Sequence, residues 1–79
     1  MPKLITVSVK SHGWLSKYFP QGDTQSMLLP EDSQVKDIVE RFSLPVEATS
    51  VIVNGKKSVL EQPLKDGDFV SLYPIVFGG

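Results

Sequence analysis

Residues 33–42, SQVKDIVERF, contain the pattern on which the prediction of the fold rests. Their apolar positions recur every three or four residues, which places them on one face of an α-helix. These positions are Val35, Ile38, Val39 and Phe42, and the opposite side carries Lys36, Asp37, Glu40 and Arg41. A helix with one apolar face has to bury that face against another layer of structure. The residues on either side of it must therefore supply that layer.

Polar and proline residues mark the two ends of this helix. We expect Asp32 or Ser33 to cap the amino end, because either side chain can accept a hydrogen bond from a free backbone N–H group. We expect Pro45 to end the helix, because proline disfavours helical geometry in the residue before it. The sequence therefore predicts one short helix between these markers.

Two strands are predicted before the helix. In KLITVSVK, residues 3–10, strict alternation puts Ile5, Val7 and Val9 on one face of a strand. The short apolar run SMLLP, residues 26–30, is the predicted second strand, and it would return beside the first as a wide hairpin.

The connection between these strands, residues 11–25, breaks the alternation with glycine and proline. We expect one helical turn within it. Four large apolar or aromatic side chains lie in that turn: Trp14, Leu15, Tyr18 and Phe19. A cluster of this kind usually closes one end of a small core, although it could also form a platform for a small molecule.

Two further hairpin-like patterns follow the helix. In SVIVNGKKSVL, residues 50–60, Asn54-Gly55 suits a tight turn with positive φ at both central positions. In PLKDGDFVSLYP, residues 63–74, a turn around Gly67 leads into a strand that should finish near Pro74, because proline cannot donate to a strand ladder.

The predicted order is strand, strand, helix, strand, short strand, strand. A hairpin followed by a helix that packs on one sheet face defines an α+β domain of two layers. If the last strand pairs parallel to the first, this is the β-grasp arrangement, with a mixed sheet of about five strands packed on one main helix. Ubiquitin has that fold. We expect residues 1–74 to form this domain and residues 75–79 to form a flexible tail that ends in Gly-Gly.

The composition excludes several classes of protein. The 79 residues include no cysteine, so disulfides, thiolate metal sites and cysteine nucleophiles are absent. The net charge of -1 comes from scattered charges without a basic patch, so we expect no nucleic-acid partner. No apolar run approaches the length of a membrane span, and the start lacks a signal-peptide pattern. We therefore expect a cytoplasmic protein without a membrane partner.

Few residues inside the domain suit catalysis or ligand binding. His12 is the single histidine, and we expect it to be a solvated loop residue rather than part of a metal site or a triad. NGKKS, residues 54–58, lacks the spacing of a phosphate-binding loop. The acidic pairs Glu31/Asp32 and Asp66/Asp68 lie where capping and turn chemistry favour carboxylates. We expect no bound cofactor and no metal.

The carboxyl-terminal residues suggest a different kind of site. Residues 75–79, IVFGG, follow the last predicted strand and would reach roughly 17 Å at about 3.3 Å per residue. Glycine has no Cβ, so Gly78 and Gly79 can pass where any side chain would clash. A carboxylate is a poor electrophile and must be activated before it reacts, for example as an acyl-adenylate. The pattern fits delivery of that carboxylate into another protein's nucleotide site, although a frayed terminus has the same appearance.

The chain resembles the ubiquitin-like sulphur-carrier family, ThiS and MoaD. The resemblance is carried by residues 51–58, VIVNGKKS, residues 63–74, the helix at 33–42 and the terminal Gly78-Gly79. The connection WLSKYFPQG, residues 14–22, makes it closer to MoaD-like members. This resemblance implies that an E1-like enzyme adenylates Gly79 with ATP. Sulphur transfer would then give a thiocarboxylate used by a downstream synthase, with Gly78 as the slender approach.

The tail departs from the family pattern at two positions. MoaD-like tails commonly have Pro-Pro-Val before a small residue and the glycines, whereas Ile75 and Phe77 replace the second proline and the small residue here. Phe77 therefore needs a pocket in any partner that holds the tail. The predicted partner-binding residues are Ile52, Tyr73, Ile75, Val76 and Phe77.

Three functions remain open on the sequence. A sulphur carrier would be a co-substrate of an activating enzyme rather than an enzyme itself, and at most the small subunit of a synthase such as molybdopterin synthase. A ubiquitin-like modifier would be joined to lysines of other proteins through Gly79. A binding module would use only its sheet face. Carrier and modifier share the same carboxylate chemistry.

Overall fold

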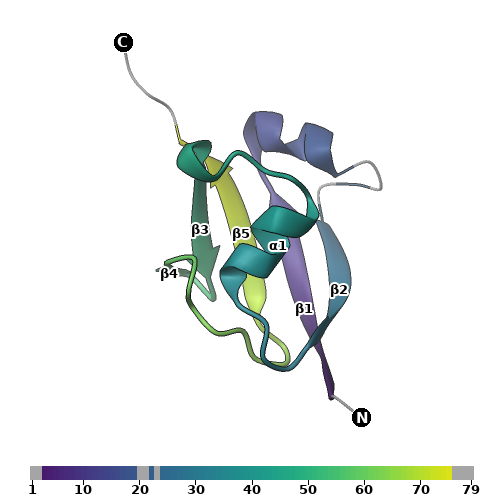
Figure 1. Ribbon diagram of the computed structural model, residues 1–79. Helices are drawn as coiled ribbons and strands as arrows, with labels where there is room; N and C mark the ends of the chain where they lie inside the picture. The colour runs from purple at the N-terminus through teal and green to yellow at the C-terminus, as the bar shows by residue number, and fades with distance from the viewer. Residues whose placement is uncertain (1–2, 20–21, 23, 76–79) are drawn as a thin grey trace.

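A five-stranded sheet and one α-helix make up the two layers of the protein in a computed structural model, which describes residues 3–19, 22 and 24–75 (Figure 1). The strands are β1 (Leu4–Ser11), β2 (Thr24–Pro30), β3 (Thr49–Val53), β4 (Lys56–Lys57) and β5 (Phe69–Pro74). The α-helix is α1 (Val35–Arg41), and two short 3₁₀ helices are η1 (Gly13–Tyr18) and η2 (Val46–Ala48).

The sheet has the strand order β2-β1-β5-β3-β4. Strands β1 and β5 pair in parallel at its centre, with Val9 opposite Val70, and the other neighbouring strands pair antiparallel. This parallel pairing of the first and last strands confirms the predicted β-grasp fold. The predicted second strand begins two residues earlier than expected, at Thr24.

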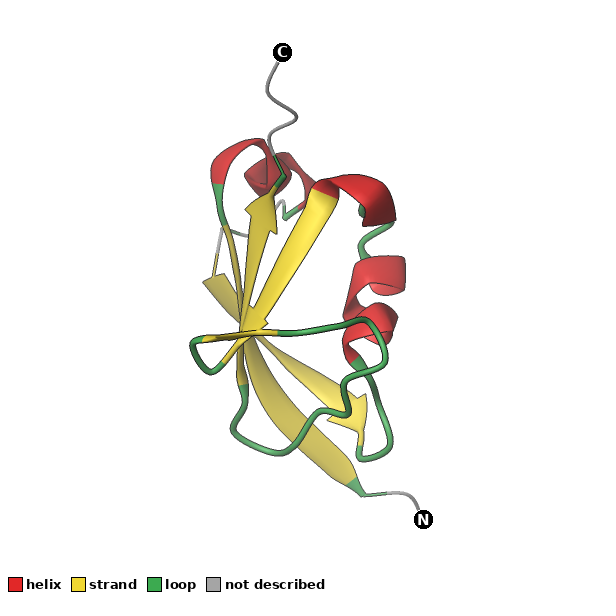
Figure 2. Ribbon diagram, turned by 90° about the vertical axis from the view of Figure 1, so that its left-hand side faces the viewer, coloured by secondary structure: helices red, strands yellow, loops and turns green. Residues whose placement is uncertain are grey.

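The core lies between α1 and one face of the sheet (Figure 2). Alternation along β1 and β5 turns every second side chain toward α1, as the sequence predicts. The fully buried residues of this layer include Val7, Val9, Val35, Ile38, Val70 and Leu72. Within the described part of the chain, none of the helices has the length and apolar character that a membrane crossing requires.

The amino end of α1 differs from the prediction. The capping residue is Gln34, whose backbone N–H donates to Asp37 Oδ2 at 2.7 Å. Ser33 is instead fixed by backbone hydrogen bonds, because its N–H donates to Pro30 and its carbonyl accepts from Leu64. Its N–H thus ties the helix start to the end of β2 and its carbonyl ties it to the loop before β5, while Asp32 lies exposed in the preceding turn. The predicted cap at Asp32 or Ser33 is therefore wrong.

The carboxyl end of α1 lies at Arg41, four residues before Pro45. Ser43 has a φ of 54°, and its N–H donates to the Glu40 carbonyl while the Leu44 N–H donates to the Val39 carbonyl. This pair of bonds is a Schellman motif, in which Leu44 packs into the core as the accompanying apolar contact. The helix therefore ends just before residues 43–45, where the sequence predicted, and the backbone geometry of Ser43 supplies the termination ahead of Pro45.

The two predicted turns after the helix are confirmed. Asn54 and Gly55 have φ values of 51° and 84°, as a type I′ turn between β3 and β4 requires. Asp68 joins this turn to the next one, because its carboxylate accepts from Asn54 Nδ2 at 2.9 Å and from the Lys65 N–H at 2.8 Å. Asp66 accepts from the Thr6 N–H at 2.7 Å. These acidic residues therefore serve turn chemistry.

Replacing Ser43 with glycine should stabilise the protein by about 0.5–1 kcal/mol. A side chain in the left-handed region costs about 1–2 kcal/mol, and the larger entropy of glycine in the unfolded chain offsets about half of that. Urea denaturation of wild type and Ser43→Gly would measure the difference. Ser43→Ala is the matched control, because it keeps the Cβ and should gain nothing. Equal stability of all three proteins would mean that the Schellman geometry carries no strain.

Replacing Phe42 with alanine should cost about 1.5–3 kcal/mol of stability, less than the loss of a fully buried ring. Phe42 is only half-buried, and its ring centroid lies 4.2 Å from that of Phe19 in the connection. Lys36→Ala, on the exposed side of α1, should stay within about 0.5 kcal/mol. Thermal denaturation would compare the two variants, and similar losses would contradict the observed phase of the helix.

Candidate functional site

The carboxyl end of β5 is the place where the predicted tail leaves the domain. Pro74 lies opposite Thr49 of β3, and the Ile75 N–H donates to the Ala48 carbonyl at 2.8 Å. Ile75 lies just outside β5, as expected, but this hydrogen bond holds its backbone. The remaining predicted site residues, Val76, Phe77, Gly78 and Gly79, lie outside the described residues.

Ile52 and Tyr73 lie on the sheet face opposite α1, as predicted. Tyr73 pairs with Ser50 and Ile52 pairs with Ser71, so the two side chains are diagonal neighbours on adjacent antiparallel strands. Tyr73 is 37% exposed and Ile52 is half-buried. Together with Ile75, which is 38% exposed, they place apolar surface close to the root of the tail.

His12 contacts this same surface, and the prediction that it is a solvated loop histidine is wrong. Its ring stacks on that of Tyr73 with centroids 4.0 Å apart and an interplanar angle of 3°. The Nε2 atom is buried and has no hydrogen-bond partner among the described residues. No sequence pattern indicates this contact, because it joins residues from opposite ends of the chain.

The turn after β1 also contacts the end of β5. Gly13 has a φ of +59°, and a Cβ built on it would lie 3.0 Å from Pro74 Cγ. The helical turn η1 begins at Gly13 and was expected from the sequence. Leu15 and Phe19 of this connection are buried in the core, which confirms that the connection closes one end of it. Trp14 is 45% exposed, with Lys17 Nζ 5.7 Å from its ring centroid.

Three further apolar side chains on the outer sheet face were not among the predicted site residues. Leu4 and Leu28 are about three-fifths exposed, at 58% and 62%, and Phe69 is 41% exposed. The register places Leu28 opposite Thr6 and Phe69 beside Ser8, so all three lie on the face that carries Tyr73. The same alternation that located Ile52 would have found them. They lie toward the end of the sheet away from the tail.

A hollow of about 510 Å³ adjoins the tail root on its other side. Ile75 lines it together with two exposed apolar residues, Val46 of η2 and Val59 of the loop after β4. Partly apolar surface therefore continues from the outer face of β5 around the edge formed by β3.

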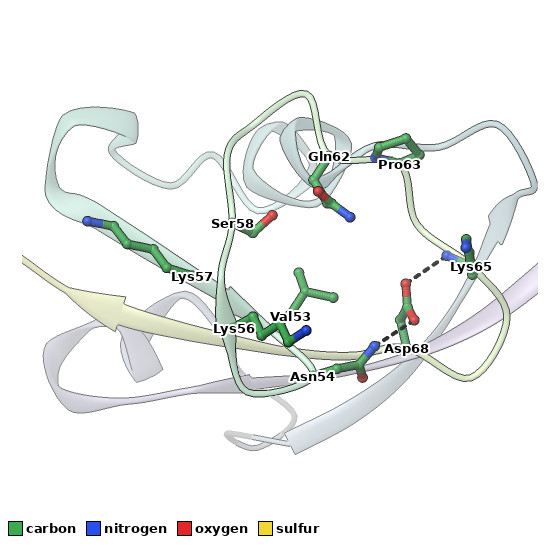
Figure 3. A pocket seen from close by; sticks show the side chains of 9 residues that line it. All are labelled: Val53, Asn54, Lys56, Lys57, Ser58, Gln62, Pro63, Lys65 and Asp68. Carbon is green, nitrogen blue, oxygen red and sulfur yellow. Dashed lines mark hydrogen bonds between the residues drawn. The ribbon is translucent and has the colours of Figure 1, made fainter.

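A second hollow, of about 350 Å³, lies between the Asn54-Gly55 turn and the loop that follows β4 (Figure 3). Val53, Ser58 and Gln62 point into it, whereas the side chain of Lys57 extends away. Lys56 and Lys65 also line it. The hairpin adjoins the start of β5, so this polar hollow lies at the end of the sheet opposite the tail.

Several of the titratable residues that the structure describes are engaged in local contacts. In the ranges 3–19 and 24–75, together with Gly22, no three histidine, aspartate or glutamate side chains lie close enough to hold a metal ion. Asp66 and Asp68 are engaged by backbone and amide donors, and His12 lies against Tyr73.

Comparison with known proteins agrees with the β-grasp fold described above and places the chain among the ubiquitin-like proteins. The chain belongs to the family described as Mut7-C ubiquitin, which it matches over residues 4–77. A solved structure of a putative molybdopterin converting factor, subunit 1, from Pyrococcus furiosus is similar, with 25% identity and a TM-score of 0.75. The match covers 91% of this chain and 99% of that one. The resemblance to MoaD-like proteins is thereby confirmed.

Two more structures show the same fold at lower identity. Small archaeal modifier protein 1 from Haloferax volcanii is 18% identical, with a TM-score of 0.76 over 91% of this chain and 99% of that one. The ubiquitin of Caldiarchaeum subterraneum is 14% identical, with a TM-score of 0.65 over 98% of this chain and all of that one. The fold is that of small ubiquitin-like carriers and modifiers rather than that of a catalytic domain.

Proposed function

We propose that this chain is a cytoplasmic sulphur carrier whose reactive group is the Gly79 carboxylate. The proposal rests chiefly on the course of β5. This central strand of the sheet ends at Pro74, and Gly78-Gly79 follow four residues later in the sequence. Two residues without side chains next to the reactive carboxylate suit entry into a narrow nucleotide site. Similarity to a molybdopterin converting factor subunit supports it. The chain would itself be a co-substrate, or at most the small subunit of a synthase, and would bind no cofactor.

The chemistry requires an E1-like adenylating enzyme and ATP. A Gly79 carboxylate oxygen attacks the α-phosphorus of ATP, which forms the acyl-adenylate and releases pyrophosphate. Hydrosulfide then attacks the carbonyl carbon, and AMP leaves with the carboxylate oxygen. The product is a thiocarboxylate in which one sulphur replaces one oxygen, with no change of oxidation state. A downstream synthase of molybdopterin or a related biosynthetic pathway would take up this sulphur.

Protein conjugation is the second candidate, and the similarity to a small archaeal modifier protein favours it. It uses the same acyl-adenylate, but the amine of a target lysine replaces AMP and leaves an amide bond to Gly79. Phe77 distinguishes this tail from the usual MoaD pattern and needs an apolar pocket in the protein that receives it. Whether the chain acts as carrier or modifier thus depends on which nucleophile attacks the acyl-adenylate, hydrosulfide or a target lysine.

Incubation with the E1-like enzyme encoded in the same genome, ATP and sulphide should raise the intact mass by about 16 Da, the difference between sulphur and oxygen. Deletion of Gly79 should abolish the gain, because it moves the carboxylate to a different position in the nucleotide site. Intact-mass spectrometry, with a reaction lacking ATP as control, measures both. Sulphur uptake by the deletion variant would refute the role of Gly79. Amide linkage to lysines without any thiocarboxylate would favour the modifier.

Ile52→Asp should weaken binding to the activating enzyme by more than about 1 kcal/mol, or about fivefold in Kd, because a charge would enter the apolar surface near the tail root. Leu28→Asp is the matched control, since it places the same charge on the same sheet face but away from the tail. Calorimetric titration gives the Kd, and thermal denaturation of the same samples shows whether Ile52→Asp remains folded. Equal weakening by both variants would contradict docking at the tail root.

A further inference from the structure

We propose that His12 and Gly13 form a clasp that fixes residues 73–75 and so positions the tail for activation. The word clasp is used below for the contacts of His12 with Tyr73 and of Gly13 with Pro74. The proposal rests on the proposed function of Gly79. It assigns His12 and Gly13 as positioning residues, since they act through β5 and do not touch the reacting carboxylate.

The stacked rings restrain Tyr73. With centroids 4.0 Å apart and planes within 3° of parallel, the His12 ring covers one face of the phenol ring. Ser11, the last residue of β1, lies opposite Leu72, and this pairing brings the next residue of each strand together. The contact therefore continues the β1–β5 pairing beyond the last paired residues of the two strands.

Gly13 restrains Pro74 by close approach. At a φ of +59° its backbone lies so near the proline ring that a Cβ would meet Pro74 Cγ at 3.0 Å and Cδ at 3.5 Å. Only glycine combines that φ with that distance at no steric cost. The turn that starts η1 thus packs directly against the last residue of β5.

Ile75 is held from the opposite side. Its N–H donates to the Ala48 carbonyl, at the junction of η2 with β3. The β1 side therefore fixes the side chains of Tyr73 and Pro74, and β3 pairs with the backbone of the same two residues. Ile75 is held from the β3 side alone, and it is the last restrained point of the described chain.

The position of this point sets how many residues separate the domain from the Gly79 carboxylate. Four residues, 76–79, follow Ile75. With the clasp open, only the pairing with β3 and the hydrogen bond to Ala48 would hold residues 73–75. If this end of β5 then frayed from β3, seven residues, 73–79, would follow Leu72. The effective concentration of a tethered group falls roughly as the −3/2 power of tether length. Lengthening the tether from four residues to seven therefore lowers the concentration of the carboxylate at an enzyme docked on the domain by about two- to threefold.

The chain offers a matched pair of variants at His12. His12→Ala removes the ring and opens the stack. His12→Phe keeps a flat ring of similar size and also removes the buried Nε2, for which the described part of the chain supplies no hydrogen-bond partner. Because burying an unpaired polar atom is unfavourable, the phenyl ring should stack at least as well. A role for the clasp therefore predicts loss in the alanine variant and rescue in the phenylalanine variant.

The first readout is adenylation of the full chain by the E1-like enzyme, measured by an ATP–pyrophosphate exchange assay. His12→Ala should raise the KM for this protein about two- to threefold and leave kcat unchanged, because the bound tail reacts as before. His12→Phe should keep the wild-type KM. A wild-type KM for His12→Ala, or a raised KM for both variants, would overturn the clasp.

The second readout is amide hydrogen exchange, which needs no activating enzyme. The Ile75 amide should exchange faster in His12→Ala than in wild type or His12→Phe, while the amides of Val7 and Val9 in β1 stay protected. Unchanged exchange at Ile75 would overturn the clasp, and lost protection in β1 would show general unfolding instead of local release. If wild type is not adenylated but Ile75 responds as expected, the proposed function fails and the restraint stands.

Discussion

The parallel pairing of β1 with β5 is the constraint on which the rest of the structure depends. It joins segments from the two ends of the chain, and their inward side chains form the part of the core that α1 covers. Hydrogen bonds at its start reinforce it, such as that from the Thr6 N–H to Asp66, across 60 positions of the sequence. Two parallel strands begin at the same end of a sheet, so the carboxyl end of β5 lies far from the start of β1 (Figure 1). That geometry separates the tail root from the amino end of β1.

Most of the fold was predictable because its signals are local. Alternation located β1 and β5, the spacing of apolar residues located α1, and Asn54-Gly55 located the tight turn. The ends of α1 were not predictable by the same means. Gln34 is not a preferred capping residue, and the left-handed backbone of Ser43 is imposed by the burial of Leu44. Both depend on what the neighbouring segments bury, and the local sequence does not contain that information.

In the candidate site, too, some features were predictable from the local sequence and others were not. Strand alternation was enough to place Ile52 and Tyr73 on the outer face, because it needs only the register within each strand. The stack of His12 on Tyr73 and the approach of Gly13 to Pro74 follow from which strands pair and where the pairing stops. A glycine after a strand suggests a turn in any sequence, but the partner that excludes a side chain there is visible only in three dimensions.

The shortness of β4 affects whether the sheet edge can pair with another copy of the same chain. Its two residues, Lys56 and Lys57, form one border of the sheet, and both are exposed. A long, flat, apolar border would recruit strands from other chains, whereas a brief one with two like charges repels an identical copy. Self-association through this border is thereby discouraged.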